Sequence, residues 1–332
     1  MRKRIKVIQC GLGPIGLRLT HLLAQRPWIE IVGAVDINPE KEGESLDALA
    51  ELRQPLDVKV VSGFEDLQGV AAHVVILTTS SQLQQTGPLI LECVARGWEV
   101  VSTCEELAFP WETHPELSSR IDSEARRQGV SVLGTGINPG FLMDYLPAAA
   151  TGLCQRVDSI RVERIQDAVF RRLPFQRKIG AGLPPREFTR RVEEGSLRHV
   201  GLTESMHLMA ACLGWTLERT EDEVEPVIAE REVELEDHTI QPGQALGVKQ
   251  TGRGWRDGLE VMTLVFQAAV GQENPRDRIH IMGSPPLEIV IPGGVNGDIG
   301  TCAITANAAH TILRAPAGLR TMADIPLVSC RN

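Results

Sequence analysis

The feature that most constrains this chain is a glycine-rich motif near its start, where residues 11–16 read GLGPIG and match the pattern G-x-G-x-x-G. A short β-rich run, RIKVIQC, precedes the motif, and apolar residues at helical spacing follow it over residues 14–26. Such a glycine loop between a strand and a helix is typical of dinucleotide binding, because the backbone and the free N–H groups of the helix can approach the pyrophosphate. A glycine turn without a ligand is the alternative. We predict cofactor contacts from the whole motif: Gly11, Leu12, Gly13, Pro14, Ile15 and Gly16.

The second predicted strand, IEIVGAVD, ends in an acid, Asp36, which stands twenty residues after Gly16. A carboxylate at this spacing accepts hydrogen bonds from the adenosine ribose and repels a 2′-phosphate, which favours NAD over NADP. Asn38 and Lys41 lie just beyond as further cofactor candidates, and because Lys41 could reach a phosphate, NADP stays possible. A turn-forming role for Asp36 is the other interpretation.

Strand and helix patterns alternate over residues 1–148. Further strands are expected at 58–63, 73–80, 98–103 and 130–135, and further helices at 44–53, 87–97 and 115–128. Nearly continuous apolar runs, such as HVVILTTS, suit a parallel sheet that is buried on both faces. We therefore predict an α/β fold in which residues 1–148 form a Rossmann-type, doubly wound parallel sheet.

The pattern changes over residues 149–297. Strand-like runs at 159–165, 224–235, 258–270, 277–283 and 287–293 are separated by turn residues at 242–243, 252–254 and 285–286, with helices at 185–196 and 201–214. This predicts a second α+β domain with a mixed or antiparallel sheet. Residues 301–315 are Ala-rich and helical, and the tail 298–332 could pack back on the first domain.

Polar residues follow several strands at the edge of a parallel sheet where ligands bind. Candidates for the cofactor there are Thr78, Thr79, Ser80, Thr103, Cys104, Asn138 and Pro139. The alternatives are a hydroxyl-rich helix cap at 78–80 and a domain-crossing loop at 134–141. Residues beyond the strands could line a substrate pocket between the domains: Ile137, Phe141, Met143, Tyr145, Phe170, Arg171 and Arg172. One of the arginines could pair with a substrate carboxylate, although solvent exposure is the commoner fate of arginine.

Two adjacent acids, Glu105 and Glu106, follow the strand WEVVST. Carboxylates are unusual beside nucleotide phosphates, so an acid pair at this edge favours an enzyme over a binding protein. Helix capping is the alternative, because Ser102 with Glu105, or Thr103 with Glu106, fits the S/T-x-x-E capping box. A nucleophilic role for Cys104 is disfavoured, since a neighbouring carboxylate raises the pKa of a thiol.

Composition and absences narrow the possible partners. The net charge of −9 and the 4% aromatic content argue against nucleic-acid and anionic membrane partners. No H-x-x-H or Cys/His framework predicts a metal site. The seven cysteines are scattered and no secretory signal is visible, so we expect reduced thiols and a cytoplasmic location. No lysine lies between Lys59 and Lys178, which removes the lysine general acid of some two-domain dehydrogenases.

The segments GLGPIG, AVDINPEKEG, VVSTCEEL and GTGINPGFLMD resemble the 2,4-diaminopentanoate dehydrogenase and native amine dehydrogenase family, within the dihydrodipicolinate reductase-like superfamily. KIGAG at 178–182 and GDIGTCAITANAAHTI at 297–312 add to the resemblance. It implies NAD or NADP as cofactor, a homodimer through the second-domain sheet, and oxidative deamination of an amine or reductive amination of a ketone or aldehyde with ammonia. The acid/base glutamate of the family maps to Glu105, with Glu106 as second choice.

Hydride transfer from an amine carbon leaves an iminium cation, which a carboxylate stabilises and a lysine repels. The sequence therefore favours an amine dehydrogenase over a dihydrodipicolinate-reductase-like or homoserine-dehydrogenase-like enzyme. A dinucleotide-binding sensor without catalysis stays open, because a fold alone does not establish an activity.

Overall fold

The computed structural model describes residues 4–169, 173–235 and 239–331. The chain divides into two compact units, Met1–Phe141 with Gly297–Asn332, and Leu142–Asn296. Sequence patterns place the first boundary at residue 148 instead. The difference has a packing cause, because Met143 and Ala148 belong to the hydrophobic core of the second unit and Asp144 accepts a hydrogen bond from Ser205 in that unit.

The first unit is built on a seven-stranded sheet of the order β15-β6-β5-β4-β1-β2-β3, in which every neighbouring pair is parallel. Its strands are β1 (Ile5–Cys10), β2 (Ile29–Val35), β3 (Val60–Val61), β4 (Val74–Leu77), β5 (Glu99–Ser102), β6 (Ser131–Gly134) and β15 (Gly318–Arg320). All residues of β4 and β6 are buried, as is typical of parallel strands covered on both faces. The predicted Rossmann-type sheet is confirmed.

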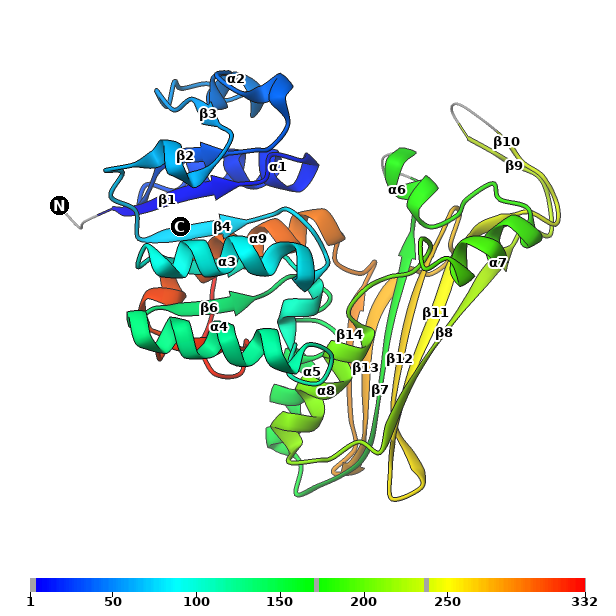
Figure 1. Ribbon diagram of the computed structural model, residues 1–332. Coiled ribbons are helices and arrows are strands. Elements are labelled where there is room, and N and C mark those ends of the chain that lie inside the picture. The colour runs from blue at the N-terminus through cyan, green and yellow to red at the C-terminus, as the bar shows by residue number, and fades with distance from the viewer. Residues whose placement is uncertain (1–3, 170–172, 236–238, 332) are drawn as a thin grey trace. The chain divides into compact units, whose positions relative to one another are not determined.

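Helices of this unit are α1 (Pro14–Ala24), α2 (Leu46–Leu49), α3 (Leu83–Ala95), α4 (Pro115–Gln128) and α9 (Gly297–Thr311), with 3-10 turns η1 (Pro39–Lys41), η2 (Phe64–Leu67), η3 (Glu105–Ala108) and η5 (Ile312–Arg314). α3 and α4 pack side by side, and α9 packs against α1 (Figure 1). The helix predicted at 44–53 is much shorter, because Glu51 adopts a left-handed φ of 51° that ends it.

The second unit contains a six-stranded mixed sheet of the order β14-β13-β7-β12-β11-β8. Only β7 and β12 pair in parallel among these neighbours. The unit's elements are α5 (Tyr145–Ala150), η4 (Thr151–Leu153), β7 (Arg156–Asp167), α6 (Leu173–Lys178), α7 (Pro185–Glu193), α8 (Leu202–Leu213), β8 (Arg219–Ile228), β9 (Val233–Glu234), β10 (Thr239–Ile240), β11 (Ala245–Arg256), β12 (Leu259–Ala269), β13 (Arg276–Ser284) and β14 (Leu287–Pro292). The predicted α+β class with a mixed sheet is confirmed.

The turn predicted at residues 252–254 is wrong, because these residues lie inside β11. A Cβ on Gly252 would lie 3.2 Å from Met206 Cε, and one on Gly254 would lie 3.2 Å from Leu217 Cδ1, so two side chains pack closely against this part of the strand. The chain reverses instead at Asp257-Gly258, where φ is 53° and 74°. Asp-Gly is a strong hairpin signal that the sequence did contain.

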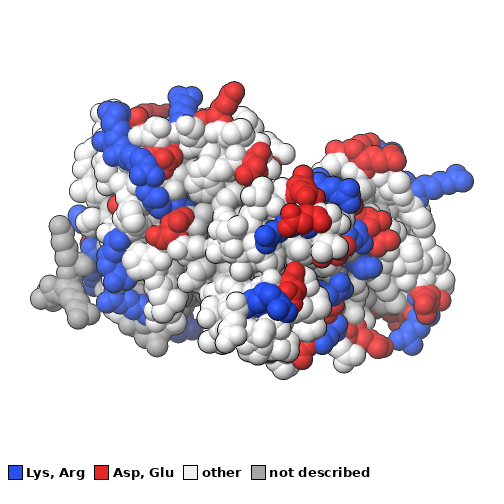
Figure 2. All heavy atoms as spheres, turned by 90° about the horizontal axis from the view of Figure 1, so that it is seen from below, with Lys and Arg blue, Asp and Glu red and all other residues white. Residues whose placement is uncertain are grey.

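The surface is mixed in charge. Acidic and basic side chains are interspersed over the face in Figure 2, without a broad patch of one sign. Helix α8 packs on β8, β11 and β12, while the other face of that sheet carries cross-strand ion pairs such as Arg278–Glu288 and Arg253–Glu223. Among the described residues, no helix combines the length and the apolar character that a membrane crossing requires.

Candidate functional site

The glycine motif forms the turn between β1 and α1. Gly11 has a φ of 85°, and a Cβ on it would lie 2.5 Å from Thr78 O. A Cβ on Gly16 would lie 1.9 Å from Gly11 O, so neither position tolerates a side chain. At Gly13, by contrast, a Cβ would meet no atom within 4 Å. Gly13 therefore leaves open space at the start of α1, where helix N–H groups carry partial positive charge.

No side chain caps the N-terminus of α1, and its first turn contains no acid. This end of the helix is therefore suited to an external anion such as a pyrophosphate. Leu12 departs from the predicted role, because its side chain is fully buried and its N–H donates to Asp36 Oδ2 at 2.6 Å. That amide stabilises the loop and is not available to a phosphate.

Thr78, the residue that follows β4, holds the glycine loop through hydrogen bonds. Its hydroxyl donates to Gly11 O at 2.6 Å and accepts from Gln9 Nε2 at 2.8 Å. Gln9 is fully buried and also donates to Gly11 O at 3.1 Å. We did not predict Gln9, although an amide inside the apolar run IKVIQC was a visible signal. Thr78 and Gln9 thus fix the loop conformation.

A cavity of about 560 Å³ opens in front of this loop. Seven of the predicted cofactor residues line it: Gly11, Gly13, Asp36, Lys41, Thr78, Thr79 and Ser80. Residues that no motif indicated complete the wall, among them Ile37, Ser62, Gly63 and Leu89. Ile37 is 87% exposed, which presents an apolar surface beside Asp36. The cavity has the loop, the helix terminus and the acid that a dinucleotide requires.

Asp36 is held by several donors at the end of β2. Besides the amide of Leu12, the N–H of Asn38 donates to Oδ1 at 2.9 Å, and Lys41 Nζ lies 3.1 Å from Oδ2. Burial acts to raise the pKa of Asp36, but the two amides and Lys41 outweigh it and lower the pKa below its usual value. Asn38 also caps η1 through its side chain, which accepts from Glu40 N at 3.0 Å. The predicted cofactor contact of Asn38 is therefore not supported for its side-chain oxygen.

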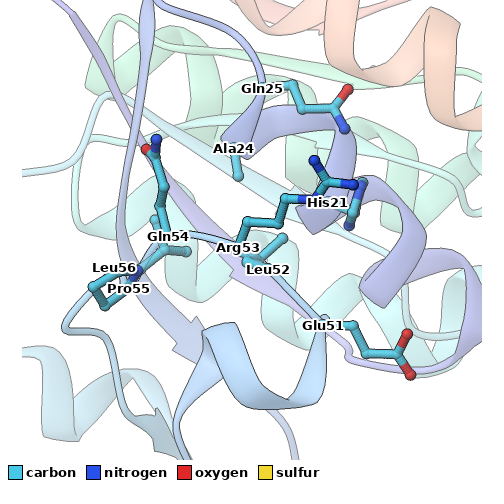
Figure 3. A pocket seen from close by; sticks show the side chains of 9 residues that line it. All are labelled: His21, Ala24, Gln25, Glu51, Leu52, Arg53, Gln54, Pro55 and Leu56. Carbon is cyan, nitrogen blue, oxygen red and sulfur yellow. The ribbon is translucent and has the colours of Figure 1, made fainter.

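A second cavity, of about 690 Å³, lies at the other end of α1. Its lining side chains come from α1 and from residues 51–56, and include His21, Gln25 and Arg53 (Figure 3). The 11 residues of α1 separate the two cavities by roughly 16 Å along the helix. This C-terminal end of the helix carries partial negative charge, which disfavours phosphate. The cavity at the glycine loop is therefore the better dinucleotide site.

The acid pair lies at the carboxyl end of β5, in η3. Glu106 Oε2 accepts from Leu83 N at 2.6 Å and lies 2.9 Å from His114 Nε2. Glu106 does cap a helix, but the helix is α3, whereas the predicted capping box would have placed its contact at Thr103. Its carboxylate joins the start of α3 to the residue before α4. Glu105, the first residue of η3, is half-buried.

Cys104 is buried beside Glu105. Its sulfur lies 3.3 Å from Ser81 O, and burial raises the pKa of the thiol to about 12. Burial therefore disfavours a thiolate nucleophile at neutral pH. Because the side chain packs in the core, only the backbone of Cys104 can meet a cofactor.

The loop after β6 carries the other predicted residues. Asn138 and Pro139 are buried, and Ile137 N donates to Thr301 Oγ1 in α9 at 3.4 Å. Phe141 and Tyr145 are half-buried. Met143 is fully buried in the core of the second unit, so its role is packing and the predicted pocket contact is not supported. Phe170, Arg171 and Arg172 lie outside the described residues.

Comparison with known proteins agrees with these features. Residues 141–331 match the family described as the 2,4-diaminopentanoate dehydrogenase C-terminal domain. The chain is 32% identical to 2,4-diaminopentanoate dehydrogenase of Acetoanaerobium sticklandii over 98% of its own length and 94% of that protein. It is 25% identical to an amine dehydrogenase of Streptomyces virginiae over 49% of this chain and 46% of that one. The solved amine dehydrogenase of Mycobacterium smegmatis has the same fold, with a TM-score of 0.87, 23% identity, and coverage of 99% and 98%.

Proposed function

Because the chain belongs to the 2,4-diaminopentanoate dehydrogenase family, we propose that it is an NAD(P)-dependent amine dehydrogenase. It oxidises a primary amine, either 2,4-diaminopentanoate-like or a simple alkyl amine, and runs the reverse reductive amination of a ketone or aldehyde with ammonia. The observation that carries the proposal is a glutamate pair at the carboxyl end of β5, on the sheet edge that also holds the glycine loop. Glu106 is engaged by Leu83 N and His114 Nε2, and the acid/base glutamate of the family maps to Glu105.

The cavity at the glycine loop fits NAD(P). The open space at Gly13 and the uncapped start of α1 would receive the pyrophosphate, and Asp36 would meet the adenosine ribose. When bound, NAD(P)⁺ supplies the hydride acceptor for the reaction.

Glu105 then acts on the nitrogen and on water. Its carboxylate takes a proton from the substrate ammonium group, which frees the nitrogen lone pair to expel a hydride from the adjacent carbon. It stabilises the resulting iminium cation and, once the first proton has passed to solvent, takes a proton from the water that adds to the C=N carbon. The carboxylic acid then returns this proton to the amino group, and the carboxylate takes the hydroxyl proton of the adduct. Collapse of that adduct releases ammonia and the carbonyl product. Glu106 holds the turn that presents Glu105, through Leu83 and His114.

The roles proposed for the second unit and for the substrate contacts are those that the family resemblance implies. We propose that residues 142–296 form the substrate-binding and dimerisation domain, and that two copies associate through the sheet face opposite α8. Ile137, Phe141 and Tyr145 are the proposed substrate contacts within the described residues.

The test is reduction of NAD⁺ or NADP⁺ by the purified protein with a panel of amines, followed by the absorbance of the reduced nicotinamide. Turnover is expected with 2,4-diaminopentanoate or with alkyl amines that lack an α-carboxylate. Dinucleotide binding without turnover on any amine or imine would support a sensor instead. Reduction of a cyclic imine, without activity on open-chain amines, would support a dihydrodipicolinate-reductase-like enzyme.

A further inference from the structure

We propose that Lys41 decides the coenzyme choice of this chain, by neutralising Asp36 and by offering its ammonium group to a 2′-phosphate, so that NADP binds as well as NAD. The inference rests on the proposed function, because it concerns the same dinucleotide site. Asp36 alone would favour NAD over NADP, so the inference assigns the acceptance of NADP to the side chain of Lys41.

Lys41 is fixed in position by its backbone and by its ammonium group. Lys41 N donates to Asn38 O at 3.0 Å, within the η1 turn that Asn38 caps. Lys41 Nζ lies 3.0 Å from Leu12 O and 3.1 Å from Asp36 Oδ2. An ammonium group has three N–H donors, so one remains for a ligand oxygen. The side chain is 22% exposed and lines the cavity, which makes that donor accessible to a ligand.

The hydrogen bonds that Asp36 already accepts limit the number that it can accept from the ribose hydroxyls. A carboxylate offers about four lone-pair sites. Oδ2 accepts from Leu12 N and Lys41 Nζ, and Oδ1 accepts from Asn38 N, so three of these sites are used. One site is left, whereas a ribose with free 2′- and 3′-hydroxyls presents two donors. Asp36 therefore gives NAD less exclusive recognition than an unpaired carboxylate would.

Charge at the cavity leads to the same conclusion. Lys41 is the one Lys or Arg among the residues that line it in the described part of the chain. Of the other acids in the lining, Glu92 pairs with Arg96 at 2.8 Å, and Glu65 is exposed to solvent. The ion pair with Lys41 thus cancels the negative charge nearest to the ribose, which is the charge that would exclude a 2′-phosphate.

The experiment compares the affinities of NAD⁺ and NADP⁺ for the wild type and for three variants by calorimetric titration, without an amine present. Lys41→Met should weaken NADP⁺ binding by roughly 10- to 100-fold, since a charge-assisted hydrogen bond is lost, while NAD⁺ binding changes by less than roughly threefold. Lys41→Arg should retain most of the NADP⁺ affinity. Lys59→Met removes the same charge from an exposed position outside the cavity and should leave both affinities unchanged.

The same comparison is made for the adenosine half alone, by titrating adenosine 2′,5′-bisphosphate and ADP. Lys41→Met should lose affinity for the 2′-phosphorylated nucleotide and keep its affinity for ADP. Equal weakening of both dinucleotides in this variant would show that Lys41 only stabilises the loop, and would overturn the inference. So would a wild type that binds NADP⁺ more than roughly tenfold more weakly than NAD⁺. Binding of both dinucleotides without amine turnover would refute the proposed function and leave this inference standing. Amine turnover with NAD⁺ but not with NADP⁺ would do the reverse.

Discussion

The open space at Gly13 gives a sharp test of where the cofactor lies. Alanine fits the backbone there, because φ is −67° and ψ is −175°. Losing glycine at a helix N-cap costs up to about 1 kcal/mol, and the lower entropy of the unfolded chain offsets about 0.4–1 kcal/mol of this. Gly13→Ala should therefore change the free energy of unfolding by less than about 1 kcal/mol, or Tm by less than roughly 4 °C. The added methyl group should occupy the space of the pyrophosphate and weaken NADH binding by roughly 5- to 150-fold, which corresponds to a steric cost of about 1–3 kcal/mol.

Gly16→Ala is the matched control, because its Cβ would lie 1.9 Å from Gly11 O in the protein itself. This variant should lose about 1–3 kcal/mol of stability or more, together with cofactor binding. Thermal unfolding by circular dichroism and titration of NADH fluorescence measure the two quantities separately. If Gly13→Ala binds NADH as tightly as the wild type, the pyrophosphate does not lie over Gly13. If Gly16→Ala is as stable as the wild type, the packing role of Gly16 is refuted.

The other predictions concern the surroundings of β5. Glu106→Gln keeps an acceptor for Leu83 N and should retain turnover within about tenfold of the wild type. Glu106→Ala loses this helix cap and should lower the free energy of unfolding by about 0.5–2 kcal/mol. A Glu106→Gln protein that is folded but inactive would assign the acid/base role to Glu106. Burial raises the pKa of Glu99 to about 7. The protonated carboxyl of Glu99 is therefore favoured more in the native state than in the unfolded chain. Its contribution to stability is fully present below about pH 4.5 and is lost as pH rises through about 7. Urea titrations of Glu99→Gln across this pH range should show a smaller decline in the free energy of unfolding, and the same decline as in the wild type would contradict this role of Glu99. Cys104→Ala should keep turnover. In the wild type, Cys104 should resist alkylation at neutral pH, as measured by mass spectrometry, because burial raises the pKa of its thiol to about 12. Rapid labelling of Cys104 in the folded protein would refute its burial.

Local patterns predicted the first unit well, because each strand and helix there has its own signal. The glycine motif between β1 and α1 and the apolar runs of β4 and β6 are contiguous in sequence, and a parallel sheet buried on both faces requires them. The acid at the end of β2 lies at the cavity for the same reason, since parallel strands end at one edge. The end of the predicted helix at 44–53 was missed, because no glycine marks the left-handed residue Glu51.

Long-range contacts account for most of the errors. Gly252 and Gly254 resembled a turn, yet they lie in β11 because they pair with residues of β8 and β12, which are distant in the sequence. Glu106 had a local capping interpretation, but its partner, Leu83, is 23 residues away. The pairing of Lys41 with Asp36 follows from the conformation of η1, which the sequence could indicate only as a turn.

The most direct measurement is the turnover of Glu105→Gln with a reactive amine at saturating cofactor, alongside its Kd for NADH and its Tm. The expected result is a loss of roughly 10²- to 10⁴-fold in kcat, with cofactor affinity and Tm close to those of the wild type. Turnover within a few-fold of the wild type would contradict the role of Glu105 as the acid/base group and iminium stabiliser.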